Sequence, residues 1–194
     1  MVFQNLSVNN EGKWGSLRNA EFCPEGSYAS GYDMKIDPYR GAWMKYDDTV
    51  LNGIKLFCES QDGQLVHNIT SDVGPWGDWV GAVSCKHLNG SKFYLTAFDL
   101  QVEPPDIREP GLVRQGILKD DTAANFVKFK CRDRGGKFQS YELAKDPGHG
   151  EFGLYGSWSE ECLFGTAICG LATKIEEDAW DNSALNDVIF YCCH

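Results

Sequence analysis

The sequence predicts an all-β fold, in which three antiparallel sheets with pseudo-threefold internal repeats form a three-sided prism. Two observations lead to this prediction. Segments that alternate apolar and polar residues, the pattern of a half-buried strand, recur along the 194 residues. They also occur in three similar copies, and three sheets that are each apolar on one face can bury those faces around a shared axis. We therefore expect residues 1–194 to form a single domain, with repeats at approximately 12–60, 73–133 and 150–194.

Each predicted repeat opens with an aromatic-Gly pair that precedes a Cys. The pairs are Trp14-Gly15, Trp76-Gly77 and Tyr155-Gly156, at 9, 9 and 7 residues before Cys23, Cys85 and Cys162. We expect the three aromatic side chains to pack in the core or at a strand edge rather than to contact a ligand, because such side chains are mostly buried.

A first strand follows in each repeat, at residues 31–37, 97–103 and 170–176. In the first copy the alternation places Tyr32, Met34 and Ile36 on one face, which we expect to point into the core. Helical spacing fits these segments less well. The expected element is therefore a strand with one buried face.

A second strand follows an Asp-rich turn, at residues 47–58, 120–131 and 181–192, and each copy has a Cys 11 residues after its first Asp. One Asn also recurs in these segments, as Asn52, Asn125 and Asn186. A residue repeated in every copy rarely belongs to one active site, so we expect these Asn side chains to bond to turns or to the strand ladder.

Charge and cysteine content restrict the class of protein. The chain has 18 basic and 28 acidic side chains, a net charge of −10, which is the wrong sign for a nucleic-acid or anionic-membrane binder. No apolar stretch reaches the length of a spanning helix, so we expect no membrane insertion. Eight Cys without close C-x-x-C pairs indicate an oxidising compartment and paired cysteines.

Three glycosylation sequons agree with an extracellular, secreted protein, and they begin at Asn5, Asn68 and Asn89. The first residues show neither the basic nor the apolar region of a signal peptide, so we expect any such peptide to have been removed. The sequence thus predicts a secreted glycoprotein.

The Trp-Gly pairs, the Asp-Asp-Thr-x-x-Asn segments and the terminal Cys-Cys resemble the vitelline membrane outer layer protein family over residues 12–193. The resemblance implies a β-prism of three four-stranded sheets, found in extracellular coats such as the egg's outer vitelline layer. Eight cysteines allow many pairings. Repeat symmetry and the resemblance together imply the pairs Cys23 with Cys58, Cys85 with Cys131, Cys162 with Cys192, and Cys169 with Cys193.

The repeats differ most in the loops between their two long strands, and threefold symmetry would gather these loops at one end of the prism. There, aromatic faces could stack on sugar rings while carboxylates accept hydroxyl hydrogen bonds. Alternatively, the acidic residues cap turns and the tryptophans cover the prism end. The predicted carbohydrate-binding residues are Tyr39, Trp43, Asp47, Glu103, Asp120, Glu176, Trp180 and Asp181.

We therefore expect a secreted, disulfide-stabilised structural or carbohydrate-binding component of an extracellular coat, whose partners are glycans or other coat proteins. The alternative is a weak glycan-processing enzyme of the chito-oligosaccharide transferase type, which the resemblance keeps open. Three near-equivalent acidic turns argue against a catalytic pair with two differently tuned carboxyl groups. The four His show no metal-ligand spacing, so we expect no metal. We also expect no catalytic residue and no cofactor.

Overall fold

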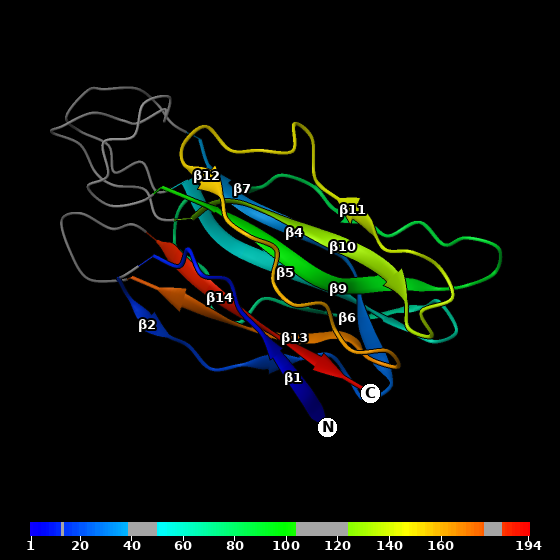
Figure 1. The fold of residues 1–194 in the computed structure, drawn as a ribbon. Helices are drawn as coiled ribbons and strands as arrows, with labels where there is room; N and C mark the ends of the chain where they lie inside the picture. Colours follow the sequence, from blue (N-terminus) through cyan, green and yellow to red (C-terminus); the bar gives the residue numbers. More distant parts are fainter. Residues whose placement is uncertain (13, 39–49, 104–123, 177–183) are drawn as a thin grey trace, which may run out of the picture.

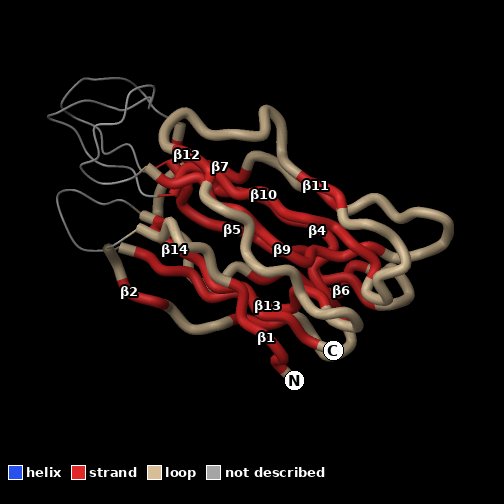
Figure 2. The backbone as a smooth tube through the Cα atoms, in the orientation of Figure 1, coloured by secondary structure: helices blue, strands red, loops and turns tan. Residues whose placement is uncertain are grey.

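The computed structural model describes residues 1–12, 14–38, 50–103, 124–176 and 184–194, which form strands and connections and contain no helix (Figures 1 and 2). Within these residues, therefore, no helix could cross a membrane. The predicted all-β class is confirmed.

Three antiparallel sheets make up the fold, and each is built on two long strands. Sheet I has β4 (Ser27–Asp37) and β5 (Val50–Ser60) at its centre, with β6 (Leu65–Ile69), β7 (Asp78–Trp79) and β8 (Val83–Ser84) beside them. Sheet II has β9 (Phe93–Val102) and β10 (Ala124–Asp133), with β11 (Tyr141–Leu143) and β12 (Leu154–Tyr155). Sheet III has β13 (Ala167–Ile175) and β14 (Leu185–Cys193), with β1 (Val2–Leu6), β2 (Ser16–Leu17) and β3 (Glu21–Phe22).

Short strands that follow in the chain complete sheets I and II. Strands β7 and β8 pair with β4, and β12 pairs with β9. The ring then closes on itself, because β2, β3 and β1 from the beginning of the chain pair with β13 and β14 near its end. The two chain ends consequently lie close together (Figure 1).

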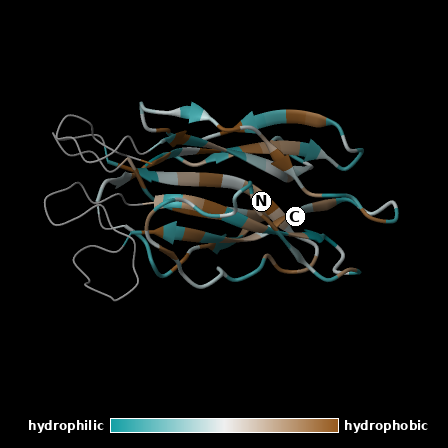
Figure 3. Ribbon diagram, turned by 90° about the horizontal axis from the view of Figure 1, so that it is seen from above, coloured by the Kyte–Doolittle hydropathy of each residue, from teal (hydrophilic) through white to brown (hydrophobic). Residues whose placement is uncertain are grey.

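The buried faces of the three sheets meet in an aromatic core. The Tyr32 ring of sheet I lies 4.6 Å from the Phe129 ring of sheet II, and Phe129 lies 5.2 Å from Phe190 of sheet III. Phe98 also packs on Phe190, with ring centroids 4.7 Å apart. Hydrophobic stretches run along the long strands and alternate with hydrophilic ones (Figure 3). The alternation predicted for Tyr32 and Met34, both fully buried, is thus the pattern that builds the core.

Three of the four disulfides join neighbouring sheets. Cys23 donates its N–H to the Cys169 carbonyl of sheet III at 2.7 Å, while its sulfur is bonded to Cys58 of β5 in sheet I. Cys85–Cys131 and Cys162–Cys192 repeat this arrangement between sheets I and II and between sheets II and III. The fourth, Cys169–Cys193, joins β13 to β14. These are the pairs that the resemblance implies, and each contributes about 3–4 kcal/mol in the chain-entropy model.

Candidate functional site

Three four-residue turns of the pattern Gly-x-aromatic-Gly lie where β4, β9 and β13 end, and we call this the turn end of the prism. The first contains Gly12, Trp14 and Gly15, with residue 13 outside the described residues, and the other two are residues 74–77 and 150–153. Their last glycines, Gly15, Gly77 and Gly153, have φ angles of 83°, 78° and 76°, which an L side chain rarely adopts. A Cβ at any of them would also clash with the backbone at the end of the adjacent long strand.

This geometry corrects the alignment of the third repeat. The sequence comparison paired Tyr155-Gly156 with Trp14-Gly15 and Trp76-Gly77, but the structure places Phe152-Gly153 in that position. Tyr155 lies instead in β12, opposite Gln101. The signal that could have found the correct register is the first glycine of the turn, since Gly12, Gly74 and Gly150 complete the pattern.

Two buried asparagines hold two of the turns. Asn186 accepts a hydrogen bond from the Trp14 N–H on its side-chain oxygen, at 3.3 Å, and one from the Gly12 N–H on its carbonyl, at 2.8 Å. Asn52 does the same for Trp76, at 3.2 Å, and for Gly74, at 2.6 Å. The bonding role expected for these repeated asparagines is confirmed at Asn52 and Asn186, which are fully buried.

A third contact fixes the first glycine of each turn. The ammonium groups of Lys35 and Lys174 donate to the carbonyls of Gly74 and Gly12 at 2.8 and 2.9 Å. In the third turn the Gln101 amide donates to the Gly150 carbonyl at 3.3 Å. All three turns are therefore held by side chains of the neighbouring repeat, so their backbones are preorganised.

The aromatic side chains of the three turns differ in exposure. Trp14 is 60% and Trp76 is 53% exposed, whereas Phe152 is only 5% exposed. Of the predicted core or strand-edge packing, the core alternative is therefore wrong for the two tryptophans, which directly precede the short edge strands β2 and β7, whereas Tyr155 lies in the edge strand β12. Hydrogen bonds hold the backbones of both residues in place, while their rings face solvent and are not part of the core. Two open aromatic surfaces and one closed position therefore occupy the turn end.

Carboxylates lie next to these turns. Gly77 packs on the peptide between Ile36 and Asp37, Gly153 on that before Glu103, and Gly15 on that before Glu176. Asp37 and Glu103 are almost fully buried, and Glu176 is half-buried. Of the predicted carbohydrate-binding residues, Glu103 and Glu176 are thus at the turn end beside the aromatic turns. The others, Tyr39, Trp43, Asp47, Asp120, Trp180 and Asp181, lie outside the described residues.

A pocket of about 340 Å³ opens between sheets I and II near the third turn. Apolar side chains that include Met34, Ile36 and Phe126 form much of its wall. Charged residues at 145, 146 and 151 also line it. An apolar wall with a few polar groups is the usual composition of a small-ligand pocket.

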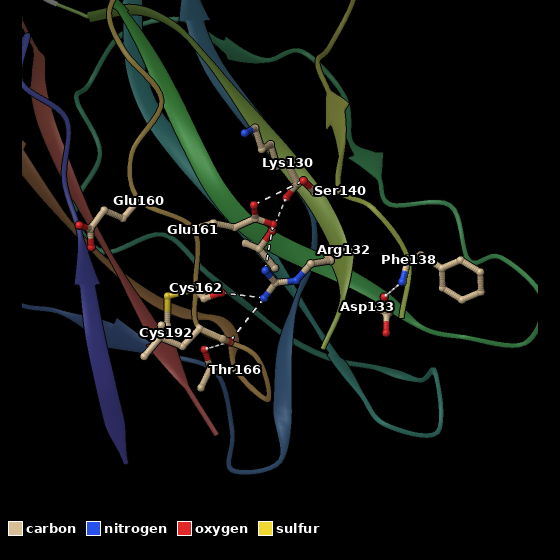
Figure 4. A network of polar contacts seen from close by, with 12 residues as sticks. Lys130, Arg132, Asp133, Phe138, Ser140, Glu160, Glu161, Cys162, Thr166 and Cys192 are labelled. Carbon is tan, nitrogen blue, oxygen red and sulfur yellow. Dashed lines mark hydrogen bonds and ion pairs between the residues drawn. A yellow bond between two sulfur atoms is a disulfide. The ribbon is translucent and has the colours of Figure 1, made fainter. Parts of the chain in front are cut away.

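A separate polar network covers the outer face of sheet II (Figure 4). Arg132 forms an ion pair with Glu161 at 3.2 Å and donates to the Cys162 carbonyl at 2.7 Å. Glu161 also accepts hydrogen bonds from Thr96 at 3.0 Å and from Ser140 at 3.4 Å. Because these charges are matched by protein groups beside the Cys162–Cys192 disulfide, the network supports the fold rather than presenting a ligand site.

Asp99 and Lys128 lie on the same outer face. The Lys128 ammonium is 4.0 Å from Asp99, 3.3 Å from Glu142 and 4.3 Å from the centroid of the Tyr155 ring. Burial raises the pKa of Asp99, and the nearby Lys128 charge opposes that rise. Within the described part of the chain, His, Cys, Asp and Glu side chains form no group of three that could hold a metal ion.

Comparison with known proteins places these features in a family context. The model of the family described as vitelline membrane outer layer protein I matches residues 4–194. The human vitelline membrane outer layer protein 1 homolog is 37% identical over 193 residues, covering 97% of this chain and 82% of the human protein. The mouse homolog is 39% identical over 191 residues, with the same coverage of 97% and 82%.

Proposed function

The chain belongs to the vitelline membrane outer layer protein I family, and on this premise we propose that it is a secreted coat component that binds glycans at the turn end of its prism. Family membership and the four disulfides make it a disulfide-stabilised extracellular structural protein. Secretion and glycan binding are the parts that we propose.

The observation that carries glycan binding is the exposure of two tryptophans on turns that are otherwise tightly held. An exposed indole face has no role in the core, and it offers a flat apolar surface of the kind that packs against a sugar ring. Because the Asn52 and Asn186 bonds already order the Trp76 and Trp14 backbones, binding would lose little backbone entropy.

A neighbouring carboxylate supports a sugar ligand rather than a purely apolar one. The half-buried Glu176 borders the Trp14 turn, whereas Asp37 beside the Trp76 turn is almost fully buried. Carboxylate oxygens accept hydrogen bonds from hydroxyl groups, and a neutral sugar has many hydroxyl donors. The overall net charge of −10 also favours a neutral glycan over a sulfated or phosphorylated one.

The test is native mass spectrometry of the protein with chito-oligosaccharides, comparing the wild type with the Trp14→Ala/Trp76→Ala double variant. We expect complexes with the wild type and about a 5- to 150-fold loss of affinity in the double variant, since each ring supplies about 0.5–1.5 kcal/mol of stacking.

The matched control is Trp79→Ala, which removes an equal ring from β7, outside the turns, where it packs on the Lys55 ammonium at 3.8 Å. Affinity equal to the wild type in the double variant, or no complex with the wild type, would refute glycan binding at the turn end. New oligosaccharide lengths in the same spectra would instead identify a glycan-processing enzyme.

A further inference from the structure

The outermost strands of the three sheets are structurally equivalent, but they are protected in different ways. Strand β1 borders β14, β6 borders β5, and β11 borders β10. In each, one apolar residue points into the core: Leu6 pairs with Phe190, Ile69 with Leu56 and Leu143 with Phe129. The residues just before them, Asn5, Asn68 and Glu142, therefore occupy the same position, on the outer face.

Strands β1 and β6 are the more vulnerable edges. Each has five residues, and among the described strands none pairs with its outer side. Each also begins with two exposed apolar residues: Val2 and Phe3 are 41% and 55% exposed, and Leu65 and Val66 are 61% and 45% exposed. A long, apolar, open edge is a template for pairing with another chain, and monomeric proteins usually block it.

Strand β11 is protected by its short length and by a charged side chain. It has only three residues, and at the shared position it carries Glu142, whose carboxylate accepts a hydrogen bond from Lys128 at 3.3 Å. A short strand with a charged residue is a common protection of a sheet edge. Strands β1 and β6 have no charge at this position; both have an asparagine.

Each of those asparagines begins a glycosylation sequon, Asn5-Leu6-Ser7 and Asn68-Ile69-Thr70. Both are exposed, and neither side-chain amide forms a hydrogen bond within the described residues. Residues 2–7 and 65–70 therefore share one pattern, in which two exposed apolar residues and one further residue precede the sequon. The sequon lies at the same point on the two unprotected edges, and β11 has none.

We propose that Asn5 and Asn68 carry N-linked glycans that cover the open edges of sheets III and I and prevent edge-to-edge association. This rests on the proposed secretion, because the modification occurs on the secretory route. The Asn side-chain nitrogen forms a bond to the anomeric carbon of an oligosaccharide carried on a lipid pyrophosphate. The bond from that carbon to the pyrophosphate breaks, and the displaced amide proton leaves with the lipid pyrophosphate.

The experiment uses the full chain secreted from eukaryotic cells. Peptide mass spectrometry after enzymatic glycan release reports the occupancy of each sequon, and light scattering reports the mass of the folded protein. We expect both edge sequons to be occupied. In the Asn5→Gln/Asn68→Gln variant, we expect the mass to rise about twofold or more at concentrations where the wild type is monomeric.

Asn89→Gln is the matched control, since Asn89 also begins a sequon but lies in the turn between Leu88 and Ser91, away from the edges. This variant should stay monomeric. Adding Phe3→Lys and Val66→Lys to the double variant should restore the monomer, because lysines on an edge oppose pairing. If the double variant folds poorly, trimming the glycans of the native protein to one sugar tests the same step.

Empty edge sequons on a secreted protein, or a monomeric double variant, would overturn the proposal and leave the glycan-binding function untouched. Retention of the chain inside the cell with reduced cysteines would instead refute the secretion on which the proposed function depends.

Discussion

The turn around Trp76 and the turn around Phe152 have the same backbone but opposite side-chain environments. Both end in a glycine with positive φ, 78° at Gly77 and 76° at Gly153, and both pack on the end of a long strand. Yet the Trp76 ring is 53% exposed and the Phe152 ring only 5%. The glycines and the contacts to the first glycine therefore determine the backbone conformation of the turn, whereas the aromatic side chain can be either exposed or buried.

The strongest test of this difference is to truncate both rings. Phe152→Ala should lower the free energy of unfolding by about 2–4 kcal/mol, because a buried ring leaves a cavity, whereas Trp76→Ala should change it by less than about 0.5 kcal/mol. Urea denaturation followed by circular dichroism measures both. Equal losses in the two variants would show that the Trp76 ring also supports the fold.

A smaller effect is expected from the residue that holds the Trp76 turn. Asn52→Ala removes the acceptor of the Trp76 N–H and should destabilise the protein by about 1–3 kcal/mol, since a buried donor loses its partner. It should also weaken chito-oligosaccharide binding by releasing the turn. Asn9→Ala, at an exposed position, is the control. Unchanged binding in Asn52→Ala would show that the glycan site does not depend on the hydrogen bond that holds the turn.

A third effect, of about the same size as that of Asn52→Ala, depends on pH and is specific to the third repeat. Asp187 occupies the place of Gly53 and Phe126, and burial raises its pKa to about 7, with nearby Glu11 adding to the rise and Lys174 opposing it. From pH about 4 to about 7 the unfolded chain releases this proton while the folded chain keeps it. The free energy of unfolding should therefore fall with rising pH in this window.

Asp187→Asn should remove that decline and stabilise the protein above pH 7 by about 1–3 kcal/mol, with little change near pH 4. Thermal unfolding at a series of pH values measures it, and Asp62→Asn, at an exposed carboxylate, is the control. A decline that persists in Asp187→Asn would assign it to other groups.

Parts of the fold and of the turn end could be predicted from the sequence, where the signal is local and repeated. The alternation around Tyr32 and Met34 identified a strand and its buried face, and the recurrence of Asn52 and Asn186 identified a structural role. Sequence alone misaligns the third aromatic turn, because Tyr155-Gly156 has the same two-residue pattern as Trp14-Gly15. Only the positive φ at Gly153 and its contact with the end of β9 identify Phe152-Gly153 as the equivalent pair.

The sequence by itself determined where the six long strands lie and which side of each is apolar, because side chains alternate with a period of two whatever the strand pairs with. Only the tertiary structure decided that β12 completes sheet II and that β1 and β2 complete sheet III. It also decided that Phe152 is buried while Trp14 and Trp76 face solvent. Pairing and exposure depend on which distant segments share a surface, and that choice is made by the packing of the whole ring rather than by any local pattern.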